Sequence, residues 1–291
     1  MLAEFLQLVF SGLTVGAVYA LVALGFTLIY NASDVINFAQ GDFVMIGGMG
    51  TVFLAAAGIA LPLAALIAII AAVIVGLLLH RLAIEPARGA SPVTLIMITI
   101  GASIFIKGVA QIVFDKQFHS LPAFSGEQAI HVGGATILPQ SLWVVGTTLV
   151  VVVGLYLFLE RTLPGKALLA TAANKLAARL VGVNVTVILA LAFGVSAAIG
   201  AIAGIVATPI TLTRYDVGTL FALKGFAAAM TGGMGNPVGA VVGGLLIGLL
   251  EAFGAGYISS TYKDAFAFII ILLVLFFMPR GLFGGRSVER V

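Results

Sequence analysis

The chain has 291 residues, of which 62% are hydrophobic and 9% are charged, and its mean hydropathy is +1.23. A soluble domain carries about 25% charged residues, so this composition excludes an ordinary soluble protein and predicts an integral membrane protein. The net charge of +3 does not indicate nucleic-acid binding, because the basic residues lie in loops that flank apolar runs. The absence of cysteine excludes disulfides, Cys-ligated metals and a thiol nucleophile.

The apolar runs predict an all-α, polytopic membrane protein. A spanning helix needs about 20 apolar residues, and the alternating pattern of an outer-membrane barrel is absent. The seventh run is interrupted by Gly232-Gly-Met-Gly-Asn-Pro237 and is predicted to form two pieces, which gives about eight spans with broken or re-entrant helices. The predicted spans, in chain order, are 5–30, 42–60, 62–80, 92–114, 141–160, 186–206, 223–257 and 265–279.

A polar break follows the first span, over residues 31–43, and contains two Asn, two Asp and one Gln. Each unpaired polar group in the hydrocarbon core costs several kcal/mol, so this segment must be buried in protein or line a wet cavity. Transport is therefore the first functional hypothesis. The residues expected to line a substrate pathway are Asn31, Asn37, Gln40, Asp42 and Lys224.

The break is echoed later in the chain. The stretch from Asp34 to Phe43 resembles the stretch from Asp216 to Phe226 with one inserted residue, and a Gly-Gly pair follows each. This indicates an internal two-fold repeat with halves at about 5–80 and 186–279, although chance similarity between apolar sequences is an alternative. Paired interrupted helices in the halves of a transporter point to its substrate pathway.

The repeat brings Asp42 close to Lys224 in the alignment. An ion pair between these two residues would offset the desolvation of both charges. The pair is expected to hold the broken helices together or, alternatively, to contact substrate directly.

The distribution of Lys and Arg predicts the orientation of the spans, because basic residues concentrate in cytoplasmic loops. The 115–140 loop, with Lys116 as its one basic residue, is then expected outside, and the N-terminus is expected inside. The residues assigned to the cytoplasm are Arg81, Arg88, Arg161, Lys166, Lys175, Arg179, Arg280, Arg286 and Arg290.

The segment 161–184 is predicted to contain a short amphipathic helix that begins at Pro164 and stops at Gly182. Leu176 and Leu180 recur at helical spacing, and Lys175 with Arg179 forms a basic stripe of residues four apart. Such a helix could lie on anionic lipid or dock into a groove on a cytoplasmic partner.

No catalytic motif is present in the sequence. The chain lacks G-x-S-x-G, H-E-x-x-H and the phosphate-binding G-x-x-x-x-G-K-[ST], and its three histidines have no metal-ligand spacing. We therefore expect no catalytic residues, no metal site and no enzymatic activity. Transport driven by nucleotide would need a separate subunit.

Three motifs carry a family resemblance that covers essentially the whole chain. Leu176-Ala-Ala-Arg-Leu-Val-Gly182 resembles the E-A-A-x-x-x-G coupling loop of ABC importer permeases, with Leu176 in the acidic position. Asn37-Phe-Ala-Gln-Gly-Asp42, and the stretch from Lys224 to Ala240, are similar to signatures of the LivH-type branched-chain amino acid permeases.

The resemblance implies a single transmembrane permease domain over residues 1–291, in a bacterial cytoplasmic (inner) membrane. It implies an ATP-driven importer of branched-chain or other hydrophobic amino acids with a second homologous permease, two ATP-binding subunits and an extracytoplasmic binding protein. The chain itself would carry no cofactor, because ATP and Mg bind the partner subunits. The implied coupling residues are Lys175, Leu176, Ala177, Ala178, Arg179, Leu180 and Gly182.

An ion- or proton-coupled carrier, or a channel for small polar solutes, is the alternative from another class. Asp34, Asp42 and Asp216 could serve such a protein as protonation sites. The coupling segment 161–184 discriminates between the two, because a carrier has no use for it.

Overall fold

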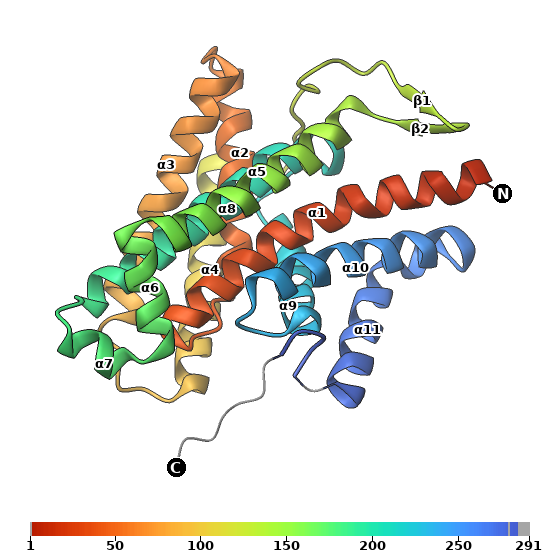
Figure 1. The fold of residues 1–291 in the computed structure, drawn as a ribbon. Helices are drawn as coiled ribbons and strands as arrows, with labels where there is room; N and C mark the ends of the chain where they lie inside the picture. Colours follow the sequence, from red (N-terminus) through yellow and green to blue (C-terminus); the bar gives the residue numbers. More distant parts are fainter. Residues whose placement is uncertain (1, 279, 285–291) are drawn as a thin grey trace.

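The computed structural model describes residues 2–278 and 280–284, and its architecture is a helical bundle with one short β-hairpin (Figure 1). The predicted all-α class is confirmed. Arg286 and Arg290 lie outside the described residues. The elements in chain order are α1 (Leu2–Ser33), α2 (Gln40–Ala56), α3 (Leu61–Leu79), η1 (His80–Ile84), α4 (Pro92–Phe114), β1 (Ile130–Val132), β2 (Ala135–Ile137), α5 (Pro139–Arg161), α6 (Leu163–Ala173), α7 (Lys175–Leu180), α8 (Val185–Thr211), α9 (Val217–Gly232), α10 (Pro237–Tyr257), η2 (Ser260–Tyr262) and α11 (Lys263–Phe277).

Within the described residues, six helical stretches are long and apolar enough to cross a membrane: α1, α3 with η1, α4, α5, α8 and α10. The helices α2 and α9 are apolar but shorter, and α11 adds a further apolar helix at the end of the chain. These elements confirm the predicted polytopic membrane protein. Their bounds follow the apolar runs, because only the regular helix satisfies every backbone amide in hydrocarbon.

The predicted division of the 223–257 run is confirmed. Helix α9 ends at Gly232, and Gly233 follows with a φ of 104°, a conformation that favours glycine. The Asn236 side chain then accepts hydrogen bonds from the backbone N–H groups of Val238 and Gly239, and Pro237 occupies the first turn of α10. A C-terminal glycine followed by an Asn cap and proline stops one helix and starts the next.

The N-terminus lies at the end of the bundle away from α6 and α7 (Figure 1). Gln7 Oε1 accepts a hydrogen bond of 2.8 Å from the backbone N–H of Thr136, so the start of α1 is beside the β-hairpin of the 115–140 loop. With the basic end of the bundle in the cytoplasm, the N-terminus is outside. The expectation that the N-terminus lies on the same side as the three basic segments is therefore wrong, because α2 runs back to the end of the bundle where α1 begins.

The three basic segments lie together at the other end, as far as the chain is described. Arg88 bonds Thr186 at the start of α8, and Lys175 of α7 bonds Asp34 just after α1. Asn31 donates to the carbonyl of Gly235, in the turn that also receives the segment from residue 280 to 284. This clustering is what the distribution of Lys and Arg predicts.

Close packing between helices depends on small residues. A Cβ added to Gly16 would lie 2.8 Å from the Leu245 Cα, and one added to Gly248 would lie 2.3 Å from the Gly16 backbone. Helices α1 and α10 therefore run side by side, and their glycines contact the backbone of the facing helix (Figure 1). This is the packing that small residues at four-residue spacing predict in membrane helices.

Candidate functional site

The predicted polar break lies where the N-termini of two short helices meet. Helix α1 ends at Ser33, Asp34 follows with a φ of 62°, and α2 begins only at Gln40. A Cβ on Gly41 would lie 1.8 Å from the carbonyl oxygen of Gly218, at the start of α9, and one on Gly218 would lie 2.4 Å from that of Gly41. Both helix N-termini, with their partial positive charge, thus converge on one point inside the bundle.

The contact between Gly41 and Gly218 is reciprocal, which is the form that a two-fold relation between α2 and α9 requires. A second pair of contacts is similar but one residue out of that register: Gly47 of α2 packs on Ala201 of α8, and Gly225 of α9 packs on Val22 of α1. In this relation Gly41 corresponds to Gly218. The sequence echo instead aligned Asp42 near Lys224, which is about one and a half helical turns further along α9.

Three of the predicted pathway residues make hydrogen bonds in or beside the break, and Gln40 ties the junction to α8. Gln40 is fully buried, and its side chain bonds the Ser196 hydroxyl (2.6 Å) and backbone carbonyl (3.2 Å) on α8. Asn37 is also buried and accepts from the backbone N–H of Ala39, while its Nδ2 has no partner among the described residues. Asn31 ties the end of α1 to the turn before α10 through Gly235.

Asp42 is the most unusual of the predicted residues. Its side chain is buried, at 1% exposure, in the first turn of α2, where it faces Ser103 of α4 without a hydrogen bond of good geometry to any described residue. The helix N-terminus offsets part of the cost of burying this charge. Nearby, Lys107 of α4 donates to Thr219 in the first turn of α9, a hydrogen bond of 3.0 Å.

Lys224 lies in a separate, buried ion network. Its Nζ is 3.0 Å from Glu251 Oε1 on α10 and 2.5 Å from Asp264 Oδ1 on α11, and it donates to the Tyr19 hydroxyl on α1. The Tyr19 hydroxyl in turn donates to Glu251 Oε2 at 3.0 Å. The predicted Asp42–Lys224 pair is therefore wrong: Lys224 finds its partners on three other helices, whereas Asp42 faces Ser103 and Lys107 of α4.

Sequence analysis missed Glu251, Tyr19 and Asp264 as members of this network. A signal was available for Glu251. It follows Gly244 and Gly248 at helical spacing, so the glycines that bring α10 against α1 place Glu251 on the same buried face. Lys224 and Asp264 reach it from helices that only the tertiary structure brings together.

This arrangement yields a testable prediction. Asp42 and Lys224 share no partner, so the destabilisation of Asp42→Asn and that of Lys224→Met should add to within about 0.5 kcal/mol in the double variant. The measurement is a double-mutant cycle on thermal stability in detergent. The matched cycle of Tyr19→Phe with Lys224→Met should show clear coupling, because those side chains are hydrogen-bonded. Coupling between residues 42 and 224 of the same size would contradict the separation of the two sites.

The predicted coupling segment forms two helices where one was expected. Helix α6 begins at Leu163, with Thr162 as its N-cap, and the break comes at Asn174, whose side chain accepts from the backbone N–H of Ala177 and so caps α7. Gly182 follows α7 with a φ of 90°. An Asn at this position competes with helix continuation and favours a new start.

The apolar side chains of α7 face away from the protein. Leu176 is 67% exposed and Leu180 is 81% exposed, whereas Ala178 is buried against the bundle. Ala177 lies exposed beside Leu176. Arg179 and Gly182 border a hollow of about 360 Å³ that also contains Arg88 of the preceding basic loop. The segment therefore presents a mixed apolar and basic surface at the basic end of the bundle.

At the opposite end, the 115–140 loop is held to the bundle by backbone and side-chain contacts. His119 and Thr213 exchange backbone hydrogen bonds, and the His119 ring lies 3.0 Å from Asp115 Oδ1. This hydrogen bond holds the pKa of the exposed Asp115 carboxyl below its ordinary value. Among the described residues, no group of His, Cys, Asp and Glu could hold a metal ion.

Comparison with known proteins decides the family. The family model described as "Branched-chain amino acid transport system / permease component" matches residues 8–275. The chain belongs to this family. It is 35% identical to the high-affinity branched-chain amino acid transport system permease protein BraD of Pseudomonas aeruginosa, over 99% of this chain and 98% of that protein. It is 33% identical to the corresponding LivH protein of Escherichia coli strain K12, over the same shares of the two chains.

A solved structure supports the fold of this permease. The chain of PsaBC from Streptococcus pneumoniae, in a complex with Fab, matches with a TM-score of 0.53 over 96% of this permease and 97% of that chain. At 14% identity, this likeness concerns the fold alone. Family membership makes the chain a permease component of a transport system and not an enzyme. The carrier or channel hypothesis is not supported, since the family is one of permease components of a transport system.

Proposed function

We propose that this permease is a subunit of an ATP-driven importer of branched-chain or other hydrophobic amino acids in a bacterial cytoplasmic membrane. The names of its relatives BraD and LivH support this substrate class. The permease would assemble with a second homologous permease, two ATP-binding subunits and an extracytoplasmic binding protein. ATP and Mg would bind the ATP-binding subunits, because this chain has no phosphate-binding loop.

One contact carries the proposed mechanism. Lys175, the first residue of α7, forms an ion pair with Asp34, which begins the break between α1 and α2. Both side chains are partly exposed, so the pair contributes at most about 1 kcal/mol of stability. The pair matters because of its position, since it links α7 to the segment between α1 and α2. A partner that moves α7 would therefore also move the segment that leads to the helix junction.

The exposed face of α7 is the proposed docking surface for an ATP-binding subunit. Closure of two such subunits would move the α6–α7 segment as a rigid body and shift the helices packed on it. Leu176 stands where the family motif has an acidic residue, so docking here relies on apolar contact by Leu176 and Leu180 with charge contacts by Lys175 and Arg179. The remaining proposed coupling residues are Ala177, Ala178 and Gly182.

The helix junction is the proposed control point of the substrate pathway. The proposed pathway residues are Asn31, Asn37, Gln40, Asp42 and Lys224. Within the described residues, the buried Nδ2 of Asn37 has no partner, which supports a polar passage at the junction, because buried polar groups without partners are rare. An amino acid zwitterion is suited to helix termini and amides of this kind.

Gly182→Arg tests the coupling role. An arginine at a φ of 90° costs about 1–2 kcal/mol of backbone strain and alters the end of α7. We expect the variant to insert in the membrane at the wild-type level and to lose ATP-driven amino acid uptake in vesicles. Gly89→Arg is the matched control, since it adds the same charge to the same end of the bundle in open space. Wild-type uptake by Gly182→Arg would refute the docking role.

A further inference from the structure

The hollow of about 360 Å³ beside α7 is lined by two segments that are distant in the sequence. The loop after η1 contributes Arg88, and the connection from α7 to α8 contributes Arg179, Gly182 and Thr186. The volume of the hollow is far larger than the roughly 30 Å³ that a water molecule occupies. It can therefore receive a side chain of another protein.

The hollow carries a positive charge that the described chain does not neutralise. Arg88 pairs with Glu85, and Lys175, on the same helix as Arg179, pairs with Asp34. Arg179 is exposed and, among the described residues, has no acidic side chain within 4.0 Å. Of the three basic side chains on and beside α7, Arg179 is thus the one whose charge remains available to a partner.

The start of α8 adds to this positive charge. Asn184, which lines the hollow, is the N-cap of α8, and the N-terminus of a helix carries a partial positive charge. The guanidinium groups of Arg88 and Arg179 and this helix end repel one another, so an anion between them is favoured. A carboxylate suits the position because a guanidinium group can bind it through two parallel hydrogen bonds.

The hollow lies at the end of the bundle and not on its lipid-facing rim. Helix α8 packs on α1, α2, α3 and α5, so its first turn is at the end of an inner helix. Figure 1 shows α7 at this same end, away from the N-terminus. Leu176 and Leu180 of α7 are exposed beside the hollow. An apolar and basic surface in this place faces a protein that docks on the end of the bundle.

We propose that the hollow receives an acidic side chain of an ATP-binding subunit, with its carboxylate at Arg179 and Arg88. Leu176 and Leu180 then contact an apolar surface next to that acid. Leu176 stands in the acidic position of the coupling motif, so in this contact the permease contributes the cations and the partner contributes the acid. The inference rests on the proposed docking role of α7 and goes beyond it by naming the chemistry of the partner's surface.

Charge reversal at position 179 tests the proposal. The permease is placed in phosphatidylcholine nanodiscs and titrated with the ATP-binding subunits that copurify with it. Arg179→Glu should raise the dissociation constant by about tenfold or more, the loss expected for a hydrogen bond to a charged group, and Arg179→Lys should lose less because it keeps the charge. Lys166→Glu is the matched control, since Lys166 is an exposed lysine of α6 that does not line the hollow. Equal dissociation constants for Arg179→Glu and Lys166→Glu would overturn the proposal.

A zero-length cross-link identifies the acid. Arg179→Lys places an amine at the hollow, and a carbodiimide joins an amine only to a carboxyl group that contacts it. Mass spectrometry should find an amide bond between position 179 and an Asp or Glu of an ATP-binding subunit. Replacing that acid with arginine should then restore the affinity of Arg179→Glu. A cross-link to carboxyl groups of this chain alone, or none in a complex that stays assembled, would overturn the proposal.

An anionic lipid headgroup is the competing occupant. Repeating the titration in nanodiscs that contain phosphatidylglycerol separates the two. An equal effect of Arg179→Glu in both lipids supports an acid of the partner, whereas an effect confined to phosphatidylglycerol assigns the hollow to lipid and overturns the proposal.

The outcomes also separate this inference from the proposed function. ATP-driven L-leucine uptake by wild type, together with wild-type affinity of Arg179→Glu for the ATP-binding subunits, overturns the acidic contact and leaves the importer intact. A wild-type permease that binds no ATP-binding subunit refutes the proposed function itself.

Discussion

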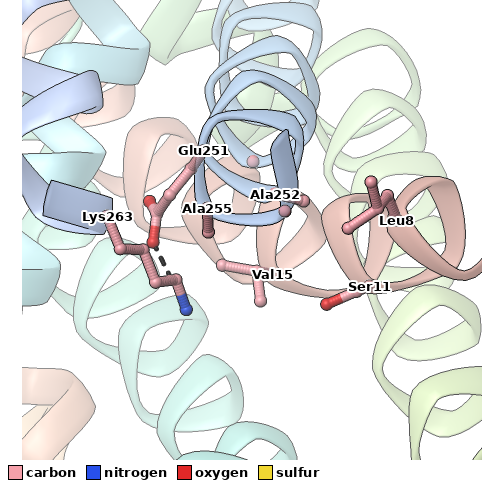
Figure 2. A pocket seen from close by; sticks show the side chains of 9 residues that line it. Leu8, Ser11, Val15, Glu251, Ala252, Ala255 and Lys263 are labelled. Atoms are coloured by element: carbon pink, nitrogen blue, oxygen red, sulfur yellow. Dashed lines mark ion pairs between the residues drawn. The ribbon is translucent and has the colours of Figure 1, made fainter. Parts of the chain in front are cut away.

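Replacing Lys224 with methionine is expected to destabilise the permease by about 3 kcal/mol or more, because it leaves the buried Glu251 with the half-exposed Lys263, at 3.5 Å, as its remaining cation (Figure 2). Glu251 has a side-chain exposure of 1%, so water cannot take over the role of the ammonium group. The measurement is the apparent melting temperature of the detergent-solubilised protein, which should fall by roughly 10 °C or more. Asp264, at 57% exposure, contributes less to this loss because it is solvated.

Two further variants control this prediction. Lys107→Met removes a lysine whose partner is the neutral Thr219 hydroxyl, so its effect should be much smaller. The double variant Lys224→Met/Glu251→Gln removes both charges and should recover part of the lost stability. A single variant Lys224→Met with wild-type stability would show that the network does not hold α1, α9, α10 and α11 together.

Replacing Gly41 with alanine is expected to have a comparable effect by a different mechanism. The added Cβ would lie 1.8 Å from the carbonyl oxygen of Gly218, and a backbone atom cannot move aside as a side chain can. Helices α2 and α9 must then separate, at a cost of about 3 kcal/mol or more, which is the upper range for overpacking. Thermal stability and the yield of folded protein both measure this loss.

The matched control for Gly41→Ala is a substitution that should raise the stability of the protein. Gly101 of α4 is helical and has open space where a Cβ would be, so Gly101→Ala should stabilise the protein by about 0.5–1 kcal/mol through helix propensity. Equal stability of Gly41→Ala and Gly101→Ala would contradict the close contact between the starts of α2 and α9.

The sequence was sufficient for most of the fold. Long apolar runs gave the spans, and the Gly-Gly-Met-Gly-Asn-Pro stretch gave the turn between α9 and α10, because glycine, an Asn cap and proline act locally. The family motifs likewise lie in contiguous segments. The side of the N-terminus was not accessible, since it depends on whether 42–60 crosses or turns back, and composition does not distinguish these cases.

The errors at the site have a common origin in tertiary geometry. The echo between Asp34–Phe43 and Asp216–Phe226 identified the two broken segments, but its register differs from that of the contacts between Gly41 and Gly218. Apolar, glycine-rich sequences align almost equally well at several registers. The partners of Lys224 come from α1, α10 and α11, and no local pattern encodes which charges such distant helices bring together. The predicted repeat halves, at about 5–80 and 186–279, stay a prediction.

The most direct test of the central proposal is substrate uptake by the purified transporter in liposomes, with and without ATP inside. The transporter is isolated gently from its native membrane through this permease, and its subunits are identified by mass spectrometry. We predict that two chains with a phosphate-binding lysine loop and a second permease copurify, and that L-leucine delivered by the binding protein is taken up only with ATP. Uptake by this permease alone, without ATP, would contradict the account.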